Sequence, residues 1–209
     1  SDLTGQFPYE VWKKMAGLGI CGIPFPEECG GGGLDWLSMI IAIEEISRGD
    51  ASLGNSLLDS VTLPMNLLCT FGTEEQKKKW LLPLATGEKI GAFGLTEAQA
   101  GSDTSAIQTR AMIEEDEWVI NGTKQFITNA GLKHNSLVII AAVTGEGEKG
   151  RKKVSNFIIP TGVGGYNFGQ RYKKMGYRSS ETSELIFDDC RIPKENILGN
   201  PDKGIAQFL

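Results

Sequence analysis

The first 88 residues place apolar side chains at helical spacing. Residues 36–46 (WLSMIIAIEEI) are apolar on most faces and follow Asp35, a residue type that caps helix N-termini, so we predict a buried helix there. Thr73 and Gln76 have the spacing of a capping box, in which each side chain bonds the backbone N–H of the other residue, and they predict a second helix start. Residues 1–88 are therefore predicted to form a helical domain.

From residue 89 onward the apolar positions follow a period of two, which is typical of β-strands. Asn121-Gly122 separates two such runs. Because this pair tolerates the positive φ angles of a type I′ turn, we predict a β-hairpin around it. Short strands with regular turn signals favour an antiparallel sandwich or barrel over alternating βαβ units. The strands predicted within this β domain, residues 89–195, are residues 117–120, 123–128, 137–143 (buried on both faces), 156–159 and 184–187.

The pattern as a whole predicts an α+β fold, with a helical domain followed by an antiparallel β-barrel or sandwich domain. Residues 196–209 have the composition of a loop followed by the first turn of a helix. Because a domain seldom ends by starting an amphipathic helix, we expect the chain to be a piece of a longer polypeptide.

Composition argues against several classes of function. The net charge of −5 over 209 residues is unlike that of a general nucleic-acid binder. No apolar run reaches the roughly 18 residues of a membrane span, and the N-terminus lacks a signal-peptide pattern. Four scattered cysteines and one histidine predict reduced thiols and no metal site. A GxGxxG match at residues 17–22 follows a predicted helix, not a strand, and so indicates a helix end.

Two short stretches are candidates for binding a ligand. Residues 94–103 (GLTEAQAGSD) are small and polar and follow an apolar strand, so the backbone there can approach a ligand closely. In residues 123–128, strand alternation places Lys124, Phe126 and Thr128 on one face, where a flat heteroaromatic ligand could stack and form a hydrogen bond. The alternative is an ordinary core phenylalanine with a threonine at the strand end.

Five segments together resemble the acyl-CoA dehydrogenase family. Two of them carry its flavin-binding signature: residues 93–103 (FGLTEAQAGSD) and 121–131 (NGTKQFITNAG). The others, in family order, are residues 18–31 (LGICGIPFPEECGG), 71–88 (FGTEEQKKKWLLPLATGE) and 174–199 (KMGYRSSETSELIFDDCRIPKENILG). The sequence is most similar to short-chain, butyryl-CoA-type members. The family fold has an N-terminal helical domain, a middle β domain and a C-terminal four-helix domain, the last absent from this sequence.

The resemblance implies a site for FAD. Leu95 and Thr96 would bond the pyrimidine edge of the isoalloxazine, Phe126 would stack beside it, and Thr128 would bond near N5. Phenylalanine replaces the tryptophan of many relatives at position 126, and Ala98 replaces a proline of the commoner loop. Glu97 and Asp103 are expected to be scaffold carboxylates that face away from the phosphates. The residues implied to bind the cofactor are Phe93, Leu95, Thr96, Gly101, Ser102, Phe126, Ile127 and Thr128.

The resemblance also implies contacts to acyl-CoA. Ser102 would reach the pyrophosphate of FAD and also the pantetheine arm of CoA. Residues 149–153 (KGRKK) form a cationic loop whose ordinary meaning is a solvated loop tip, but some relatives contact the nucleotide end of CoA there. Arg151 is the residue of this loop that we expect to bind the substrate.

The activity implied by the family is FAD-dependent α,β-dehydrogenation of an acyl-CoA to the trans-2-enoyl-CoA. Electrons would pass to an electron-transfer flavoprotein, and the catalytic glutamate base is expected in the missing C-terminal domain, with no catalytic residue in this segment. The family further implies a homo-oligomer, tetramer or dimer, in the cytoplasm of a bacterium or in the mitochondrial matrix. The alternatives are a same-fold enoyl-CoA reductase, acyl-CoA oxidase or flavin monooxygenase, or a non-catalytic fragment that binds partners.

Overall fold

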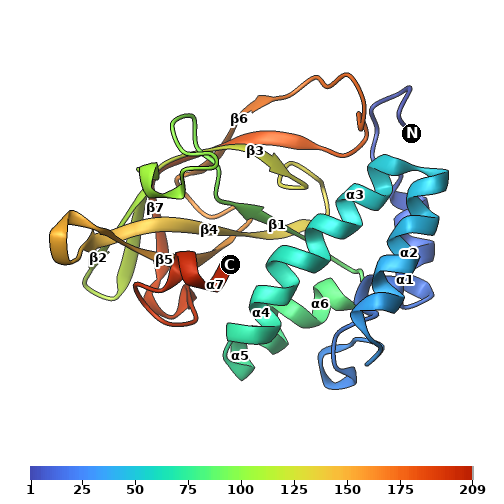
Figure 1. Ribbon diagram of the computed structural model, residues 1–209, viewed down its shortest axis with the longest axis horizontal. Helices are drawn as coiled ribbons and strands as arrows, with labels where there is room; N and C mark the ends of the chain where they lie inside the picture. Colours follow the sequence, from blue (N-terminus) through green and yellow to red (C-terminus); the bar gives the residue numbers. More distant parts are fainter. Residues whose placement is uncertain (209) are drawn as a thin grey trace.

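The computed structural model describes residues 1–208, with only the backbone at Lys149. Its N-terminal part is helical (Figure 1). Two wider π-helical turns, Val61–Met65 and Lys77–Leu81, join α3 to α4 and α5 to α6. The α-helices of this part are α1 (Tyr9–Gly17), α2 (Trp36–Gly49), α3 (Ala51–Ser60), α4 (Asn66–Phe71), α5 (Glu74–Gln76) and α6 (Leu82–Ala85).

The remainder is one eight-stranded, mostly antiparallel sheet. Its strand order is β6-β7-β3-β2-β4-β5-β8, and β1 pairs with β4. The pairs β1–β4 and β2–β4 are parallel, a detail that the strand pattern does not predict. The elements are β1 (Ile90–Gly94), β2 (Arg110–Glu114), β3 (Glu117–Thr128), β4 (Asn135–Glu146), β5 (Lys152–Pro160), β6 (Tyr166–Arg171), β7 (Thr182–Pro193), β8 (Ile197–Leu198) and a final helix α7 (Gly204–Phe208).

One of three buried apolar clusters in the described part of the chain joins the helices to the sheet. Leu57 of α3 and Leu68 of α4 belong to the same buried cluster as Leu137 and Ile139 of β4, and none of these four side chains is exposed. Figure 1 accordingly shows α3 and α4 beside the sheet, with α1 and α2 farther out. Of the run 137–143 that was predicted to be buried on both faces, residues 137–142 are buried and Val143 is partly exposed.

The predicted helix starts are confirmed in atomic detail. The backbone N–H of Ser38 donates to Oδ1 of Asp35 at 2.8 Å, which caps α2. The N–H of Gln76 donates to Oγ1 of Thr73 at 3.2 Å, and the N–H of Thr73 donates to Oε1 of Gln76 at 3.1 Å, which completes the capping box of α5.

The predicted hairpin at Asn121-Gly122 is wrong. These residues lie inside β3, which runs without a turn through both predicted strands, and the hairpin is instead formed between β2 and β3. The pairing with β7 slips between Ile120 and Gly122, so the Asn-Gly pair forms an irregularity in a long strand. The side chain of Asn121 bonds both the backbone N–H and the carboxylate of Asp189 on β7, which holds the irregularity in place.

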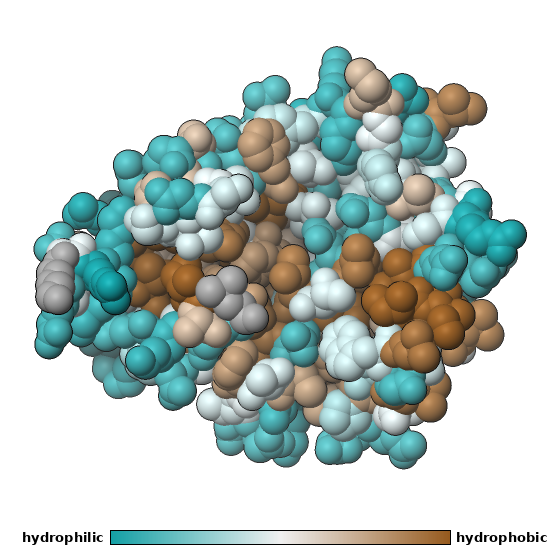
Figure 2. All heavy atoms as spheres, in the orientation of Figure 1, coloured by the Kyte–Doolittle hydropathy of each residue, from teal (hydrophilic) through white to brown (hydrophobic). Residues whose placement is uncertain are grey.

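The prediction that the helix after Asp35 is buried on most faces is also wrong. Only Met39 and Ile43 of α2 are buried. Leu37 is 66% exposed and Ile41 is 52% exposed. Figure 2 shows an apolar surface, in brown, on the helical side of the molecule. Within residues 1–208 no helix is both long and apolar enough to cross a membrane.

Candidate functional site

The fold brings the two candidate ligand-binding stretches together. The backbone N–H of Gln125, on β3, donates to the carbonyl oxygen of Thr96 at 2.8 Å. Beside it, Nζ of Lys124 donates to the carbonyl oxygen of Leu95 at 3.1 Å. The loop after β1 therefore lies directly against the C-terminal half of β3, although about thirty positions separate them in the sequence.

The prediction that Lys124 shares a face with Phe126 is wrong. Lys124 is fully buried, whereas Phe126 is 58% exposed. The register of β3 against β7 shifts between Lys124 and Ile127, and both of these side chains point inward. In a regular strand one residue separates two inward-facing side chains, but here two residues, Gln125 and Phe126, lie between them. The extra residue forms a β-bulge, in which Phe126 adopts a φ of 61° and points outward. Its ring lies 4.8 Å from that of Tyr172, so two aromatic rings stand side by side at the surface.

Glu97 is the central carboxylate of this region and behaves as the expected scaffold residue. It accepts hydrogen bonds from Lys124 Nζ at 2.7 Å, from the backbone N–H of Gln108 at 2.7 Å and from that of Thr109 at 3.1 Å. Burial alone would raise the pKa of Glu97, but the Lys124 ammonium and these hydrogen bonds hold it below its ordinary value. Burial lowers the pKa of Lys124 to about 8, against the opposing effect of Glu97.

Asp103 is the second expected scaffold carboxylate, and it bonds locally. Its Oδ1 accepts from the backbone N–H of Ser105 at 3.0 Å and from the Ser105 hydroxyl at 2.6 Å, which lowers the pKa of Asp103. Gly101 and Ser102, just before it, are exposed, and a Cβ at Gly101 would meet no atom within 4 Å. This turn therefore presents small, open backbone that a phosphate could approach.

Thr128 lies at the end of β3, half-buried against the helical part. The Asp59 carboxyl of α3 lies beside it; burial raises the pKa of this carboxyl, and the Thr128 hydroxyl acts in the opposite direction. Asn129, which follows, donates from Nδ2 to the carbonyl oxygen of Ser56 at 2.9 Å. Asp59 thus lies beside the candidate site, a position that the sequence reasoning missed because nothing in the helical pattern of α3 indicates which strand it faces.

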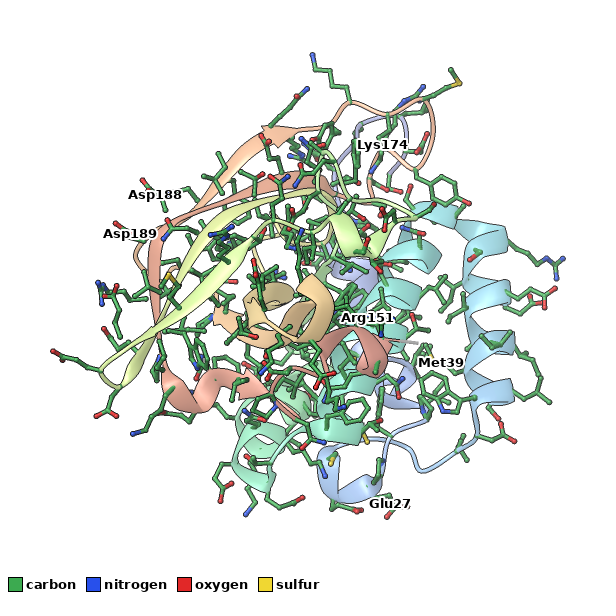
Figure 3. The ribbon with its side chains drawn as sticks, turned by 60° about the vertical axis from the view of Figure 1, so that its left-hand side comes forward. Glu27, Met39, Arg151, Lys174, Asp188 and Asp189 are labelled. Carbon is green, nitrogen blue, oxygen red and sulfur yellow. The ribbon has the colours of Figure 1, made fainter. Side chains whose placement is uncertain are left out.

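The remaining predicted residues divide between exposed and covered positions. Ile127 is 3% exposed, so any contact from it to a ligand would use its backbone. Phe93 is half-buried, and its ring packs at 4.7 Å against Phe208 of α7. Arg151 does not lie beside Phe126 and Thr128 but next to α7 (Figure 3).

Arg151 lines a cavity of about 690 Å³ between the turn after Ser102, the start of β5 and α7. Two of the neighbouring cations are already engaged: Lys152 donates from Nζ to the carbonyl oxygen of Ile107 at 2.7 Å, and Lys153 pairs with Asp202 at 3.0 Å. The side chain of Lys149, part of the same predicted cationic loop, lies outside the described residues. The cavity is lined by Thr104, Ser105, Ile107, Gly150, Arg151, Lys152, Val154, Asp202, Lys203, Ile205 and Ala206.

The chemistry of this arrangement suits a flat heteroaromatic ligand with phosphates. Phe126 offers an exposed ring, Thr96 and Thr128 offer hydroxyl groups, and the Gly101-Ser102 turn offers backbone N–H groups. In the described part of the chain, no group of three or more histidine, cysteine, aspartate or glutamate side chains is arranged to hold a metal ion.

Comparison with known proteins follows the same division of the chain. Residues 1–88 match the acyl-CoA dehydrogenase N-terminal domain, and residues 92–190 match the acyl-CoA dehydrogenase middle domain. A probable acyl-CoA dehydrogenase of Bacillus subtilis, YngJ, is 48% identical over all of this chain and 54% of its own length. The short-chain specific acyl-CoA dehydrogenase of Clostridium acetobutylicum is 48% identical over 97% of this chain and 53% of its own length.

Solved structures agree with these relatives. A chain from the electron transferring flavoprotein structure of Acidaminococcus fermentans superposes with a TM-score of 0.92 and 44% identity, over 99% of this chain and 53% of its own. Butyryl-CoA dehydrogenase of Megasphaera elsdenii gives a TM-score of 0.92 and 41% identity, over 99% and 54%. Acyl-CoA dehydrogenase of Bacillus anthracis complexed with FAD gives 0.86 and 36% identity, over 95% and 33%.

These matches span about half the length of the curated relatives, 53–54% in the two named here. Within this chain they extend over both the helical part and the sheet. The chain belongs to the acyl-CoA dehydrogenase family.

Proposed function

We propose that this chain supplies the helical and β domains of an FAD-dependent dehydrogenase that converts short-chain acyl-CoA to trans-2-enoyl-CoA. The observation that carries the proposal is the outward-facing Phe126, held at a positive φ beside the loop of Leu95 and Thr96. A non-glycine residue at positive φ is uncommon, and such residues cluster at active sites and ligand clamps. The relatives named for short-chain acyl-CoA and butyryl-CoA support the choice of substrate.

The described residues fit FAD. Phe126 would lie against the isoalloxazine, Thr96 and Thr128 would donate hydrogen bonds to its edge, and the open turn at Gly101 and Ser102 would take the pyrophosphate. Bound FAD would supply the hydride acceptor for the β hydrogen of the acyl group. The chain itself would bind, orient and partly desolvate the reactants. Related structures of this family include one complexed with FAD, which supports the assignment.

Substrate binding would use the other side of the same turn. Ser102 would meet the pantetheine arm, and Arg151, at the cavity lined by Thr104 and Ser105, would meet the phosphates of the CoA nucleotide. A guanidinium suits phosphate because its planar fork donates two parallel hydrogen bonds. The base that removes the α proton would be a glutamate outside this chain.

The proposed electron acceptor is an electron-transfer flavoprotein, and the proposed assembly is a homo-oligomer. The similarity to a chain in the electron transferring flavoprotein structure of Acidaminococcus fermentans supports this partner. An oxidase would instead pass its electrons to oxygen, so the rate at which oxygen reoxidises the reduced protein separates the two readings.

The test is anaerobic reduction of the full-length protein that contains this chain. The purified protein should contain FAD, and butyryl-CoA should bleach the flavin absorbance faster than a long-chain acyl-CoA does. Reoxidation should be fast with an electron-transfer flavoprotein and slow with oxygen. A protein that neither contains nor takes up FAD, or whose flavin no acyl-CoA reduces, would contradict the proposal.

A further inference from the structure

An unusually buried ion pair joins the two segments of the candidate site. Nζ of Lys124 lies 2.7 Å from Oε1 of Glu97, and the two side chains are 0% and 2% exposed. In every other ion pair of the described chain both side chains are at least 23% exposed. This pair therefore differs in kind from the solvated surface pairs.

A contribution to folding stability does not explain why this ion pair is buried. Removing two charges from water costs several kcal/mol per ion, and replacing a buried ion pair by apolar groups of similar size is often neutral or stabilising. Buried ionic groups are instead well suited to fixing one arrangement of neighbouring backbone, because each donor and acceptor must find its partner. The partners of Lys124 and Glu97 show which backbone they fix.

The pair ties three segments to one point. Lys124 also donates to the carbonyl oxygen of Leu95 at 3.1 Å, which holds the loop after β1. The carboxylate of Glu97 takes the backbone N–H groups of Gln108 at 2.7 Å and Thr109 at 3.1 Å, which holds the segment before β2. Glu97 is itself closed into a tight loop, since its N–H donates to the carbonyl oxygen of Ala100 at 2.9 Å.

The inward position of Lys124 also sets the direction of Phe126. With Lys124 and Ile127 both buried, the strand must bulge between them, and the bulge turns Phe126 outward at a φ of 61°. An apolar side chain at 124 could fill the same space, but it would not hold the Leu95 carbonyl. The spacing between this carbonyl and the Phe126 ring would then depend on packing alone.

We propose that Lys124 and Glu97 are positioning residues that set the spacing between the Leu95-Thr96 edge and the Phe126 ring around FAD. The inference rests on the proposed function. Neither side chain need touch the cofactor, because each acts through the backbone that it holds. Loss of residues that orient ligand-bearing groups costs about 10–100-fold in affinity at metal sites, and we expect the lower end of that range for this pair.

The test compares the full-length protein with the double variant Glu97→Gln/Lys124→Met, which removes both charges and nearly keeps the volume. We expect its dissociation constant for FAD to rise about tenfold, and the spectrum of bound flavin to shift toward that of free FAD. The urea midpoint should fall only modestly, because the amide at position 97 can still accept from one of the backbone N–H groups of Gln108 and Thr109 but not from both. The matched control is Glu45→Gln/Arg48→Met, which removes an exposed pair on α2 with an N–O distance of 3.0 Å. This control should leave FAD binding unchanged.

A second variant, Glu97→Asp, keeps both charges but shortens the carboxylate by one methylene group. It should also weaken FAD binding several-fold, and it keeps the inference testable if the double variant fails to fold. Unchanged FAD affinity and spectrum in a folded variant would overturn the inference, as would weaker binding that merely follows a large loss of stability. Failure of the unmodified protein to bind FAD would instead refute the proposed function, and this inference with it.

Discussion

Replacing only one member of the buried pair should be far more harmful than replacing both. In Glu97→Gln the Lys124 ammonium stays fully buried, loses its negative partner at 2.7 Å and keeps the Leu95 carbonyl at 3.1 Å as its neutral acceptor. Breaking a buried ion pair from one side typically costs about 3–5 kcal/mol, because an uncompensated charge is left in the interior. We therefore expect Glu97→Gln to lower the free energy of unfolding by about this amount, with a matching decrease in melting temperature.

The assay is urea unfolding of the full-length protein, monitored by tryptophan fluorescence. Thermal melting is a second, independent measurement of stability. Addition of Lys124→Met to Glu97→Gln should restore most of the lost free energy of unfolding, since the stranded charge is removed. The control Glu45→Gln disrupts a pair whose side chains are 61% and 73% exposed, and it should have no measurable effect. A Glu97→Gln variant as stable as the unmodified protein would refute the reasoning about burial.

Four further predictions concern the same regions. The folded-state pKa of Lys124, about 8, is below its unfolded value of about 10.4, so the unfolded chain binds more protons between these values. The free energy of unfolding of the unmodified protein relative to Glu97→Gln/Lys124→Met, which lacks both titrating groups, should therefore rise as pH increases across that window and stay level between neutral pH and its lower limit, as urea titrations would show. Thr128→Ala should alter the flavin spectrum and slow flavin reduction, whereas Thr123→Ala on the same strand should do neither; equal behaviour would remove Thr128 from the site. Arg151→Ala should raise the KM for acyl-CoA several-fold with little change in kcat, and an equal defect with an acyl-pantetheine substrate would show that Arg151 does not bind the nucleotide. Residues 1–209 alone should bind FAD weakly and show no acyl-CoA turnover, and turnover by this segment would contradict the placement of the base outside it.

Local signals in the sequence predicted local structure well. The Asp35 cap and the Thr73–Gln76 capping box involve residues three positions apart, so their hydrogen bonds can be predicted without knowing the tertiary fold. The change from helical to alternating periodicity is also a local signal. It predicted that the sheet starts near residue 89, and β1 begins at Ile90. The parallel pairing of β1 with β4 was not predictable, because periodicity does not tell which strands meet.

The errors at the site share one physical cause, which is pairing over long sequence distances. Asn121-Gly122 has the local chemistry of a turn, but β7 pairs across it and Asp189 bonds the Asn121 side chain, so the strand continues. Strict alternation predicted that Lys124 and Phe126 share a face. In the structure Lys124 instead points into the interior, where it forms an ion pair with Glu97 of another segment. In both places tertiary contacts outweighed a local preference worth about 1 kcal/mol.

The motif resemblance predicted which segments lie together more accurately than the periodicity did. It placed Leu95, Thr96, Phe126 and Thr128 together, and the structure brings the two segments into direct backbone contact. It could not indicate Asp59, whose position beside Thr128 depends on how α3 packs against the sheet. The role of each of these residues toward FAD stays a prediction.

The most direct test of the central claim is a crystal structure of the full-length protein with FAD bound. We predict that the isoalloxazine lies against the Phe126 ring, with the hydroxyl groups of Thr96 and Thr128 within hydrogen-bonding distance of its edge. The pyrophosphate should lie at the Gly101-Ser102 turn. A flavin bound elsewhere, with Phe126 free and the loop of Leu95 and Thr96 making no contact to it, would contradict the account.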